Sequence, residues 1–393
     1  MTNHEIIALE QSAMMQTYGR LPIAVSHGKG ATWYDADGKK YIDFTSGIGV
    51  NALGLCDEDF IAAVTDQLHK AQHVCNYYYT ESSAKLAAKL TELSGLSRVF
   101  LANSGAEANE GAIKVARKYS YDKYGEGRGT ILTLKSSFHG RTMNTLMATG
   151  QEKFHQWFYP FPTGFAYVEA GNMDALEAAY TPDVCAVMVE PIMGEGGVYP
   201  LEETYLQALR AFCDAHDLLL ICDEVQCGIG RTGKMFAYQW AGILPDVLTL
   251  AKGLGGGLPI GAFLCGEKCA ETLGKGMHGS TFGGNPVAAA GALVVLDKLT
   301  APDFMSEVLR KGEKIRDAVL SAAPKAVKGV RGKGLMLGFQ VDGTPADYLK
   351  AAAEAGLLVL TAGSDTVRLL PPLNISDKEL SEGVEILKQI LDN

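Results

Sequence analysis

Residues 218–233 read LLLICDEVQCGIGRTG, an apolar run that passes directly into a carboxylate and then into a glycine-rich loop. A near-continuous apolar run such as 218–222 is typical of a strand that is buried on both faces of a sheet. Asp223 follows at the carboxyl end of that strand, where open α/β sheets bind their ligands. The stretch therefore predicts a parallel sheet with a ligand crevice and a carboxylate that faces it.

The segments on either side of this strand alternate between strand-like and helical patterns, which favours an α/β fold with a mostly parallel sheet covered by helices. The expected strands lie at 98–102, 130–134, 184–189, 247–250 and 260–265, and the expected helices at 107–121, 174–180 and 203–216. From Pro286 onward the pattern changes to a smaller α+β region. Its expected helices lie at 287–298, 304–322, 345–355 and 377–391, and its expected strands at 334–340 and 367–370.

These changes of pattern predict three parts. Residues 1–55, with short strands at 32–35 and 41–44, form an N-terminal segment that packs with the small domain or at a dimer interface. Residues 56–297 form the large domain, and residues 298–393 form the small α+β domain.

Composition excludes several classes of protein. The 393 residues include 35 Lys and Arg against 45 Asp and Glu, and this net charge of -10 disfavours a nucleic-acid binder. The longest apolar stretch, 287–296, is far shorter than the roughly 20 residues that a membrane span needs. No basic region followed by an apolar block is visible at the N-terminus, so a soluble, cytoplasmic protein is expected. The spacing of the eight cysteines does not fit zinc ligands, so reduced thiols and no metal site are expected.

Two stretches of sequence resemble three motifs of other chemistries but match them poorly. Gly228–Gly233 fits G-x-G-x-x-G, yet no convincing helix opens directly after it, as a dinucleotide site requires. With Lys234 the same loop is nearly a P-loop, but Met235 stands where Ser or Thr must bind magnesium. Ser82 and Lys85 fit S-x-x-K without the partner motifs of that hydrolase class, and a helix start is favoured there.

Two further features converge with Asp223. Ser104 can cap a helix that opens after the strand at 98–102, and Gly105 lets the backbone approach an anion, which favours a phosphate site. Lys252 ends an apolar strand and precedes a glycine, so a desolvated lysine able to form a Schiff base is expected. Taken singly, an ordinary capped helix explains Ser104 and Gly105 equally well, and a solvated surface charge is the more common explanation of a lone lysine. Together with Asp223 they are the parts of a pyridoxal phosphate site.

The chain resembles the class III, fold type I aminotransferases that depend on pyridoxal 5'-phosphate, and within them the acetylornithine aminotransferases. The motifs that carry the resemblance span nearly the whole chain. They are YGRLP (18–22), DFTSGIGVN (43–51), NSGAEANE (103–110), FHGRT (138–142), EPIMGEGG (190–197), DEVQCGIGRTG (223–233), LAKG (250–253) and HGSTFGGNP (278–286). The sequence departs from the family pattern at Met193, where glutamine is common, and at LCDE (55–58).

The resemblance implies two catalytic residues. Lys252 would hold the cofactor covalently and then move the proton between the substrate carbon and the cofactor. Asp223 would pair with the pyridine nitrogen and keep it protonated, since an ion pair away from bulk water favours both charged forms. Gln226 would contact the 3-oxygen of the ring.

The resemblance also implies how the rest of the cofactor is held. Ser104, Gly105 and Ala106 would bind its phosphate at the helix start. Phe138 and Val225 would contact the two faces of its ring. In this family the threonine that matches Thr281 reaches the phosphate in the neighbouring subunit, which implies a homodimer with shared active sites. Ser280, beside it, is expected at the substrate.

Three charged residues would select the substrates. Arg368 matches the arginine that holds the α-carboxylate of glutamate or 2-oxoglutarate, and Arg141 matches the one that binds the other carboxylate. Glu195 matches a gating glutamate that pairs with Arg368 while the donor presents a terminal amine. A mobile counter-charge is needed there because an unpaired buried arginine is costly.

By resemblance, the expected activity is transfer of the terminal amine of N-acetylornithine to 2-oxoglutarate, with N-succinyl-diaminopimelate as a possible second donor. Ornithine δ-aminotransferase and 4-aminobutyrate aminotransferase share every cofactor residue and remain alternatives. A pyridoxal phosphate aminomutase or epimerase would need no 2-oxoglutarate. An oxidoreductase using the loop at 228–233 would leave Lys252 without a role, and a non-catalytic binding module would need neither Lys252 nor Asp223.

Overall fold

The computed structural model describes residues 1–392. Within that range seven strands form the central sheet, in the order β4-β12-β11-β10-β7-β5-β6. Their bounds are Arg98–Ala102 for β4, Thr130–Leu134 for β5, Phe165–Val168 for β6, Val184–Val189 for β7, Leu219–Asp223 for β10, Val247–Leu250 for β11 and Gly261–Cys265 for β12. The strands from β11 to β6 pair in parallel, and β12 runs antiparallel to both of its neighbours. The predicted α/β class with a mostly parallel sheet is therefore confirmed.

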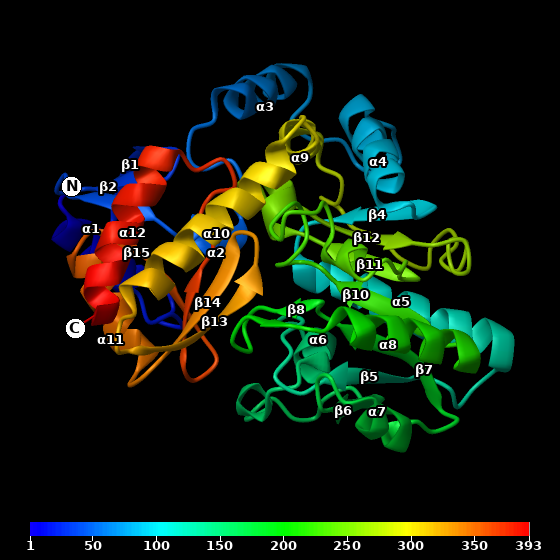
Figure 1. Cartoon of the computed structure of the whole chain (residues 1–393). Helices are drawn as coiled ribbons and strands as arrows, with labels where there is room; N and C mark the ends of the chain where they lie inside the picture. Colours follow the sequence, from blue (N-terminus) through cyan, green and yellow to red (C-terminus); the bar gives the residue numbers. More distant parts are fainter. Residues whose placement is uncertain (393) are drawn as a thin grey trace.

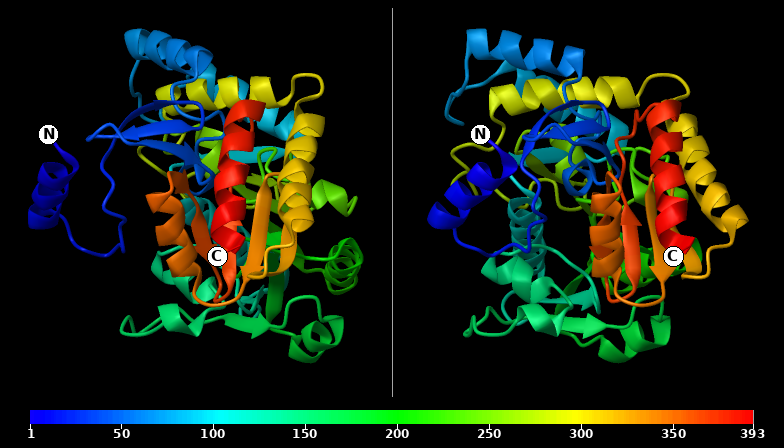
Figure 2. Two further views of the ribbon diagram at one scale, coloured as in Figure 1. Left: turned by 60° about the vertical axis from the view of Figure 1, so that its left-hand side comes forward. Right: turned by 90° about the vertical axis from the view of Figure 1, so that its left-hand side faces the viewer.

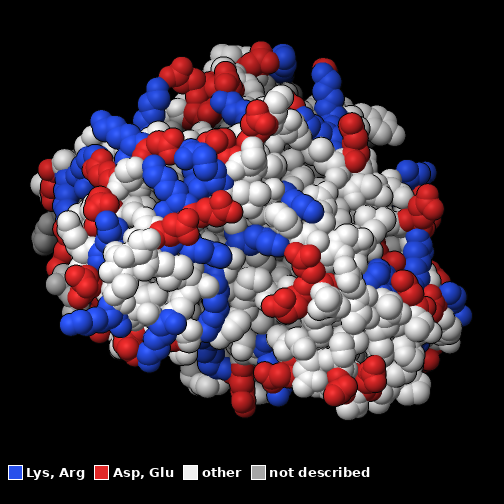
Figure 3. Space-filling model, viewed as in Figure 1, with Lys and Arg blue, Asp and Glu red and all other residues white. Residues whose placement is uncertain are grey.

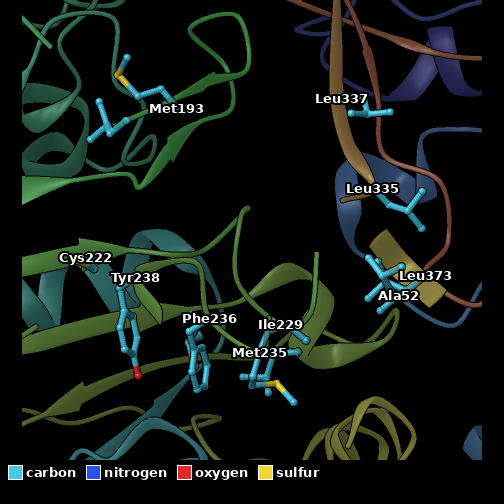
Figure 4. Packing of buried hydrophobic residues seen from close by; sticks show 14 of the residues in the cluster. Ala52, Met193, Cys222, Ile229, Met235, Phe236, Tyr238, Leu335, Leu337 and Leu373 are labelled. Carbon is cyan, nitrogen blue, oxygen red and sulfur yellow. The ribbon is translucent and has the colours of Figure 1, made fainter. Parts of the chain in front are cut away.

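Strand β10 is buried on both faces because its side chains alternate between two hydrophobic clusters. Leu219 and Ile221 belong to the cluster that contains the apolar face of α5 (Gly105–Tyr124). Leu220 and Cys222 belong to the cluster that contains the apolar face of α8 (Glu203–His216). Figure 4 shows Cys222 in this core together with Phe236 and Tyr238, whose rings stack with their centroids 5.6 Å apart.

The remaining helices of the large sheet follow the same alternation along the chain (Figure 1). They are α3 (Glu58–Lys70), α4 (Glu81–Ser94), α6 (Met143–Ala148), α7 (Met173–Ala179) and the long α9 (Pro286–Leu299). Helix α4 starts beside Ser82, as expected. Helix α5 begins two residues before the predicted position, because Ser104 caps it by accepting a hydrogen bond from the Glu107 amide.

The C-terminal region forms a second sheet, ordered β13-β14-β17-β16, against which three helices lie (Figure 1). Its strands are β13 (Val327–Lys333), β14 (Met336–Val341), β16 (Leu360–Ala362) and β17 (Thr366–Leu369), and its helices are α10 (Phe304–Ala322), α11 (Pro345–Glu354) and α12 (Asp377–Asp392). Strand β13 was not expected from the sequence. Its side chains are half-buried or exposed and it carries no apolar run, so only its pairing with β14 identifies it.

The N-terminal strands join this C-terminal region. Strands β1 (Val25–Lys29), β2 (Thr32–Asp35) and β3 (Lys40–Asp43) form an antiparallel sheet, and β15 (Leu357–Leu358) adds to β3 in parallel. Helix α1 (Asn3–Ala13) buries no residue and projects from the body of the chain (Figure 2). Strand β15 thus joins the N-terminal strands to the C-terminal region, while the division into residues 1–55, 56–297 and 298–393 stays a prediction.

The surface carries charges of both signs, interspersed over the face drawn in Figure 3. Six of the eight cysteines are buried, and each is a free thiol. Among residues 1–392, no helix has the length and the apolar character that a membrane crossing requires.

The glycine-rich loop after β10 is a packing element. Gly230 and Gly233 adopt positive φ angles, and an added Cβ would lie 2.9 Å from Leu299 and 2.4 Å from Leu309 respectively. The loop is buried against α9 and α10 and leaves no room for a nucleotide. The dinucleotide and P-loop interpretations of residues 228–235 are therefore disfavoured.

Glu224 connects the start of this loop to the segment that follows it. Its carboxylate oxygens accept hydrogen bonds from the backbone amides of Ala237 at 2.6 Å and Tyr238 at 2.7 Å, at the start of the 3-10 helix η2 (Ala237–Trp240). The side chain is fully buried, and burial raises its pKa to about 8. The loop is therefore pinned by a carboxyl group that retains its proton near neutral pH.

This raised pKa has a measurable consequence for stability. Between about pH 4.5 and pH 8 the folded protein keeps a proton that the unfolded chain has lost, so the free energy of unfolding falls as pH rises. In Glu224→Gln this contribution disappears. We expect denaturant titrations from pH 5 to 8 to give a slope flatter than that of the wild type by up to about 1.4 kcal/mol per pH unit. Parallel slopes for the two proteins would contradict the assignment.

Candidate active site

A cavity of about 430 Å³ lies where the central strands end at their carboxyl edge. Its walls come from the loops after β4, β5, β10 and β11, which are far apart in the sequence. Of the residues predicted for the site, nine line this cavity. They are Ser104, Gly105, Ala106, Phe138, Arg141, Asp223, Val225, Gln226 and Lys252.

Lys252 opens the 3-10 helix η3 (Lys252–Gly255) directly after β11. Its φ angle of 44° lies in the left-handed region, which costs energy for a residue with a side chain and is frequent at functional sites. Burial lowers the pKa of its amine; Glu195 opposes this shift, and Arg368 adds to it. The lowered pKa makes a neutral, nucleophilic amine more accessible.

Asp223 ends β10 and is buried in the cavity wall. Asn109 of α5 donates a hydrogen bond of 2.7 Å to its Oδ2, and Nδ1 of His139 lies 2.7 Å from the same oxygen. Its Oδ1 accepts from the amide of Val225 at 3.0 Å. Three partners thus fix the direction of the carboxylate. Asn109 and His139 were not predicted as site residues, although both lie inside the motifs NSGAEANE and FHGRT.

The start of α5 forms a cradle at one end of the cavity. The Oγ of Ser104 accepts from the amide of Glu107 at 3.1 Å, and the first turn leaves further backbone amides without helical partners. An added Cβ at Gly105 would lie 2.6 Å from Cγ1 of Val225, so only glycine fits between the helix start and that side chain. Such a helix start is a ready-made site for a phosphate or another anion.

Glu195 and Arg368 form an ion pair beside Gln226 and are not among the residues that line the cavity. The guanidinium of Arg368 donates to Glu195 Oε1 at 2.6 Å and to Gln226 Oε1 at 2.9 Å. The Gln226 amide donates to the same Glu195 oxygen at 3.2 Å. Burial alone would raise the pKa of Glu195, but Arg368 outweighs it and the pKa lies below its ordinary value. Because Gln226 also lines the cavity, it connects this pair to the main site.

Arg141 differs from Arg368 because it has no anionic partner. In the part of the chain that the structure describes, no hydrogen bond or ion pair of its guanidinium is found. The side chain is exposed at the cavity mouth and lies over aromatic rings. It is therefore free to bind a carboxylate that enters from solvent.

Ser280 and Thr281 lie outside the cavity. Ser280 accepts a hydrogen bond of 3.0 Å from the side chain of Asn103, and Asn103 lines the cavity. Thr281 is exposed. The single chain thus does not bring Thr281 to its own site, and the expected contact with a neighbouring subunit stays a prediction.

Glu190 is a further buried carboxyl that sequence reasoning missed. It lines the cavity and accepts hydrogen bonds from the amides of Phe138 at 2.8 Å and Gly194 at 3.1 Å. Burial raises its pKa to about 7. The residue ties the loop of Phe138 to the loop of Glu195. Its position in EPIMGEGG is the one sequence signal that could have identified it.

Comparisons with known proteins identify the family of the chain. The model of the aminotransferase class-III family matches residues 13–391. The acetylornithine aminotransferase of Haemophilus ducreyi is 54% identical and aligns with 100% of this chain and 99% of the relative. That of Methanocaldococcus jannaschii is 45% identical over 99% and 98% of the two chains.

Solved structures give the same result. The ornithine aminotransferase of Toxoplasma gondii superposes with a TM-score of 0.95 at 31% identity, covering 100% of this chain and 95% of that chain. The N-acetylornithine aminotransferase of Stenotrophomonas maltophilia superposes with a TM-score of 0.85 at 39% identity, covering 98% of both. The predicted fold type I architecture is confirmed, and the chain belongs to the class-III aminotransferases.

Proposed function

We propose that the chain transfers the terminal amine of N-acetylornithine to 2-oxoglutarate, with pyridoxal 5'-phosphate as cofactor. The products are N-acetyl-glutamate 5-semialdehyde and glutamate, formed in two half-reactions at one site. The observation that carries this proposal is the cavity that unites Lys252, Asp223 and the start of α5. The substrate is supported by full-length identity of 54% to an acetylornithine aminotransferase.

The residues present fit pyridoxal phosphate. Ser104, Gly105 and Ala106 line the cavity at the start of α5, where the free backbone amides of the first turn would bind the phosphate, and Gly105 lets this helix start pack directly against Val225. Phe138 and Val225 line the cavity between this cradle and Lys252 and would contact the ring faces. When bound, pyridoxal phosphate supplies a ring that accepts the electron pair released as the substrate loses a proton.

Two residues of the chain carry the chemistry in this proposal. The Lys252 amine, with its pKa lowered by burial, binds the cofactor and afterwards takes and returns the proton of the substrate carbon. The Asp223 carboxylate, held by Asn109 and His139, would pair with the ring nitrogen and stabilise its protonated form. Gln226 would contact the 3-oxygen of the cofactor ring.

Two arginines distinguish the two half-reactions. Arg141 binds the α-carboxylate of N-acetylornithine, and later the γ-carboxylate of glutamate or 2-oxoglutarate. Arg368 stays paired with Glu195 while the terminal amine reacts, and binds the α-carboxylate of glutamate once Glu195 moves away. The pair therefore lets one cavity accept donors with and without a carboxylate at the reacting carbon. Ser280 would contribute from its place beside Asn103.

The ornithine aminotransferase alternative has support of its own. The backbone matches that of the Toxoplasma gondii enzyme with a TM-score of 0.95, so the fold does not separate the two donors. The higher sequence identity to acetylornithine aminotransferases, 42–54% in the relatives compared, favours N-acetylornithine. N-succinyl-diaminopimelate and 4-aminobutyrate are the further donors to test.

We also propose a homodimer, located in the cytoplasm, with shared active sites. Thr281 lies outside the active-site cavity of its own chain, and the adjacent Phe282 is 61% exposed. Tyr77, Tyr78 and Tyr79 are likewise exposed by 70% or more, which is unusual for apolar side chains unless a partner covers them. In the dimer, Thr281 would reach the phosphate bound to the other subunit.

The proposal is tested by the visible absorption of the purified protein with pyridoxal phosphate. We expect a band from the lysine-bound cofactor that is lost on addition of N-acetylornithine and restored by 2-oxoglutarate. Lys252→Ala should lose turnover by at least about 10³-fold, since it removes both the covalent attachment and the proton carrier. A band that persists with N-acetylornithine but is lost with ornithine or 4-aminobutyrate would refute the donor. Absence of any band would refute the cofactor.

The role of Glu195 predicts a change in specificity. In Glu195→Gln the Arg368 guanidinium loses its counter-charge and becomes available to α-carboxylates. We expect kcat/KM for glutamate, relative to that for N-acetylornithine, to rise about tenfold, equivalent to ~1.4 kcal/mol. Glu203→Gln is the matched control, because Glu203 forms a surface ion pair with Lys333 at 3.0 Å outside the cavity. An unchanged ratio in Glu195→Gln would show that the pair is not a gate.

A further inference from the structure

The Arg141 side chain is held in place without any anion. Glu110 of α5 accepts hydrogen bonds from the Thr142 hydroxyl and from Asn144 at 3.0 Å. This carboxylate is therefore engaged by the neighbours of Arg141 and not by Arg141 itself. A guanidinium without hydrogen-bond partners at a cavity mouth would otherwise sample many rotamers.

The contact that Arg141 does make is with Phe154. The guanidinium carbon lies 4.3 Å from the centroid of the Phe154 ring, closer than the 5.6 Å to the Phe138 ring. Phe154 ends the short 3-10 helix η1 (Glu152–Phe154) and meets the edge of Phe138 at 6.0 Å between centroids. One half-buried ring thus touches both the arginine and an aromatic wall of the cavity.

A ring is suited to hold an arginine that must bind a substrate. A carboxylate partner would neutralise the guanidinium and compete with the incoming carboxylate. The ring face attracts the cation but leaves all the N–H groups of its edge free for bidentate binding. Lys153 lies over the same ring at 4.9 Å, so a second positive charge adds to the attraction for an anion.

We propose that Phe154 is a positioning residue. It holds the Arg141 guanidinium, which has no anionic partner, ready to bind the substrate carboxylate that is distant from the reacting carbon. This inference rests on the proposed function. It adds that affinity for both substrates depends on an aromatic ring outside the cofactor residues, since Arg141 serves N-acetylornithine in one half-reaction and 2-oxoglutarate in the other.

The test compares Phe154→Leu with the wild-type holoenzyme. We expect KM for N-acetylornithine and for 2-oxoglutarate to rise about threefold to tenfold while kcat changes less than twofold, because a cation–π contact is lost. The decisive second donor is N-acetyl-1,4-diaminobutane, which is N-acetylornithine without its α-carboxylate. In single-turnover measurements, the rate constant of the half-reaction should depend on the concentration of this donor in the same way in both proteins. Phe154→Tyr and Phe154→Trp keep a ring and should retain the wild-type KM values.

Phe161→Leu is the matched control. Phe161 is a half-buried ring of the same segment that contacts His155 and Tyr159 and not Arg141, so its loss should leave the KM values unchanged. If Phe154→Leu affected donors with and without the carboxylate equally, or if the KM values did not change, Phe154 would be a structural residue only and the inference would be overturned.

Failure of the proposed function is recognised separately. A wild-type protein that does not use N-acetylornithine refutes that donor. The glutamate and 2-oxoglutarate measurements then still test Phe154, because Arg141 is assigned the γ-carboxylate of both. The visible band of the bound cofactor should be unchanged in Phe154→Leu, which confirms that the variant is folded.

Discussion

The Asp223 carboxylate, buried at the carboxyl end of β10, is the feature on which the rest of the site depends. A carboxylate in that position is costly unless it is hydrogen-bonded, and Asn109, His139 and the Val225 amide supply the bonds. These partners fix α5 and the loop after β5 against the same strand end. The anion cradle, the aromatic wall and Lys252 are thereby brought around one cavity.

Much of this arrangement was predictable from local patterns. The apolar run before Asp223, the capping serine at 104 and the lysine at a strand end are short-range signals, and each marked its place correctly. The contacts of Asp223 were not predictable in this way, because Asn109 and His139 lie 114 and 84 residues away in the sequence. Glu190 and strand β13 were not predicted for a similar reason, because only their tertiary contacts identify them.

The two arginines of the site are held by opposite means. Arg368 is buried and paired with Glu195, which balances its charge. Arg141 is exposed, and an aromatic ring supports it without neutralising it. The cost of an unpaired charge explains the difference, since it is high in the interior and low at a solvent-exposed mouth. In the proposed function, the site would thus combine an anion site that opens when this pair separates with one that is always accessible.

The central claim is that Lys252 binds the cofactor covalently in the cavity that Asp223 anchors. The most direct measurement is borohydride reduction of the protein loaded with pyridoxal phosphate, followed by peptide mass spectrometry. The account predicts that the reduced phosphopyridoxyl group is found on the peptide that contains Lys252, and that Lys252→Ala carries none. Modification of a different lysine, or no modification at all, would contradict it.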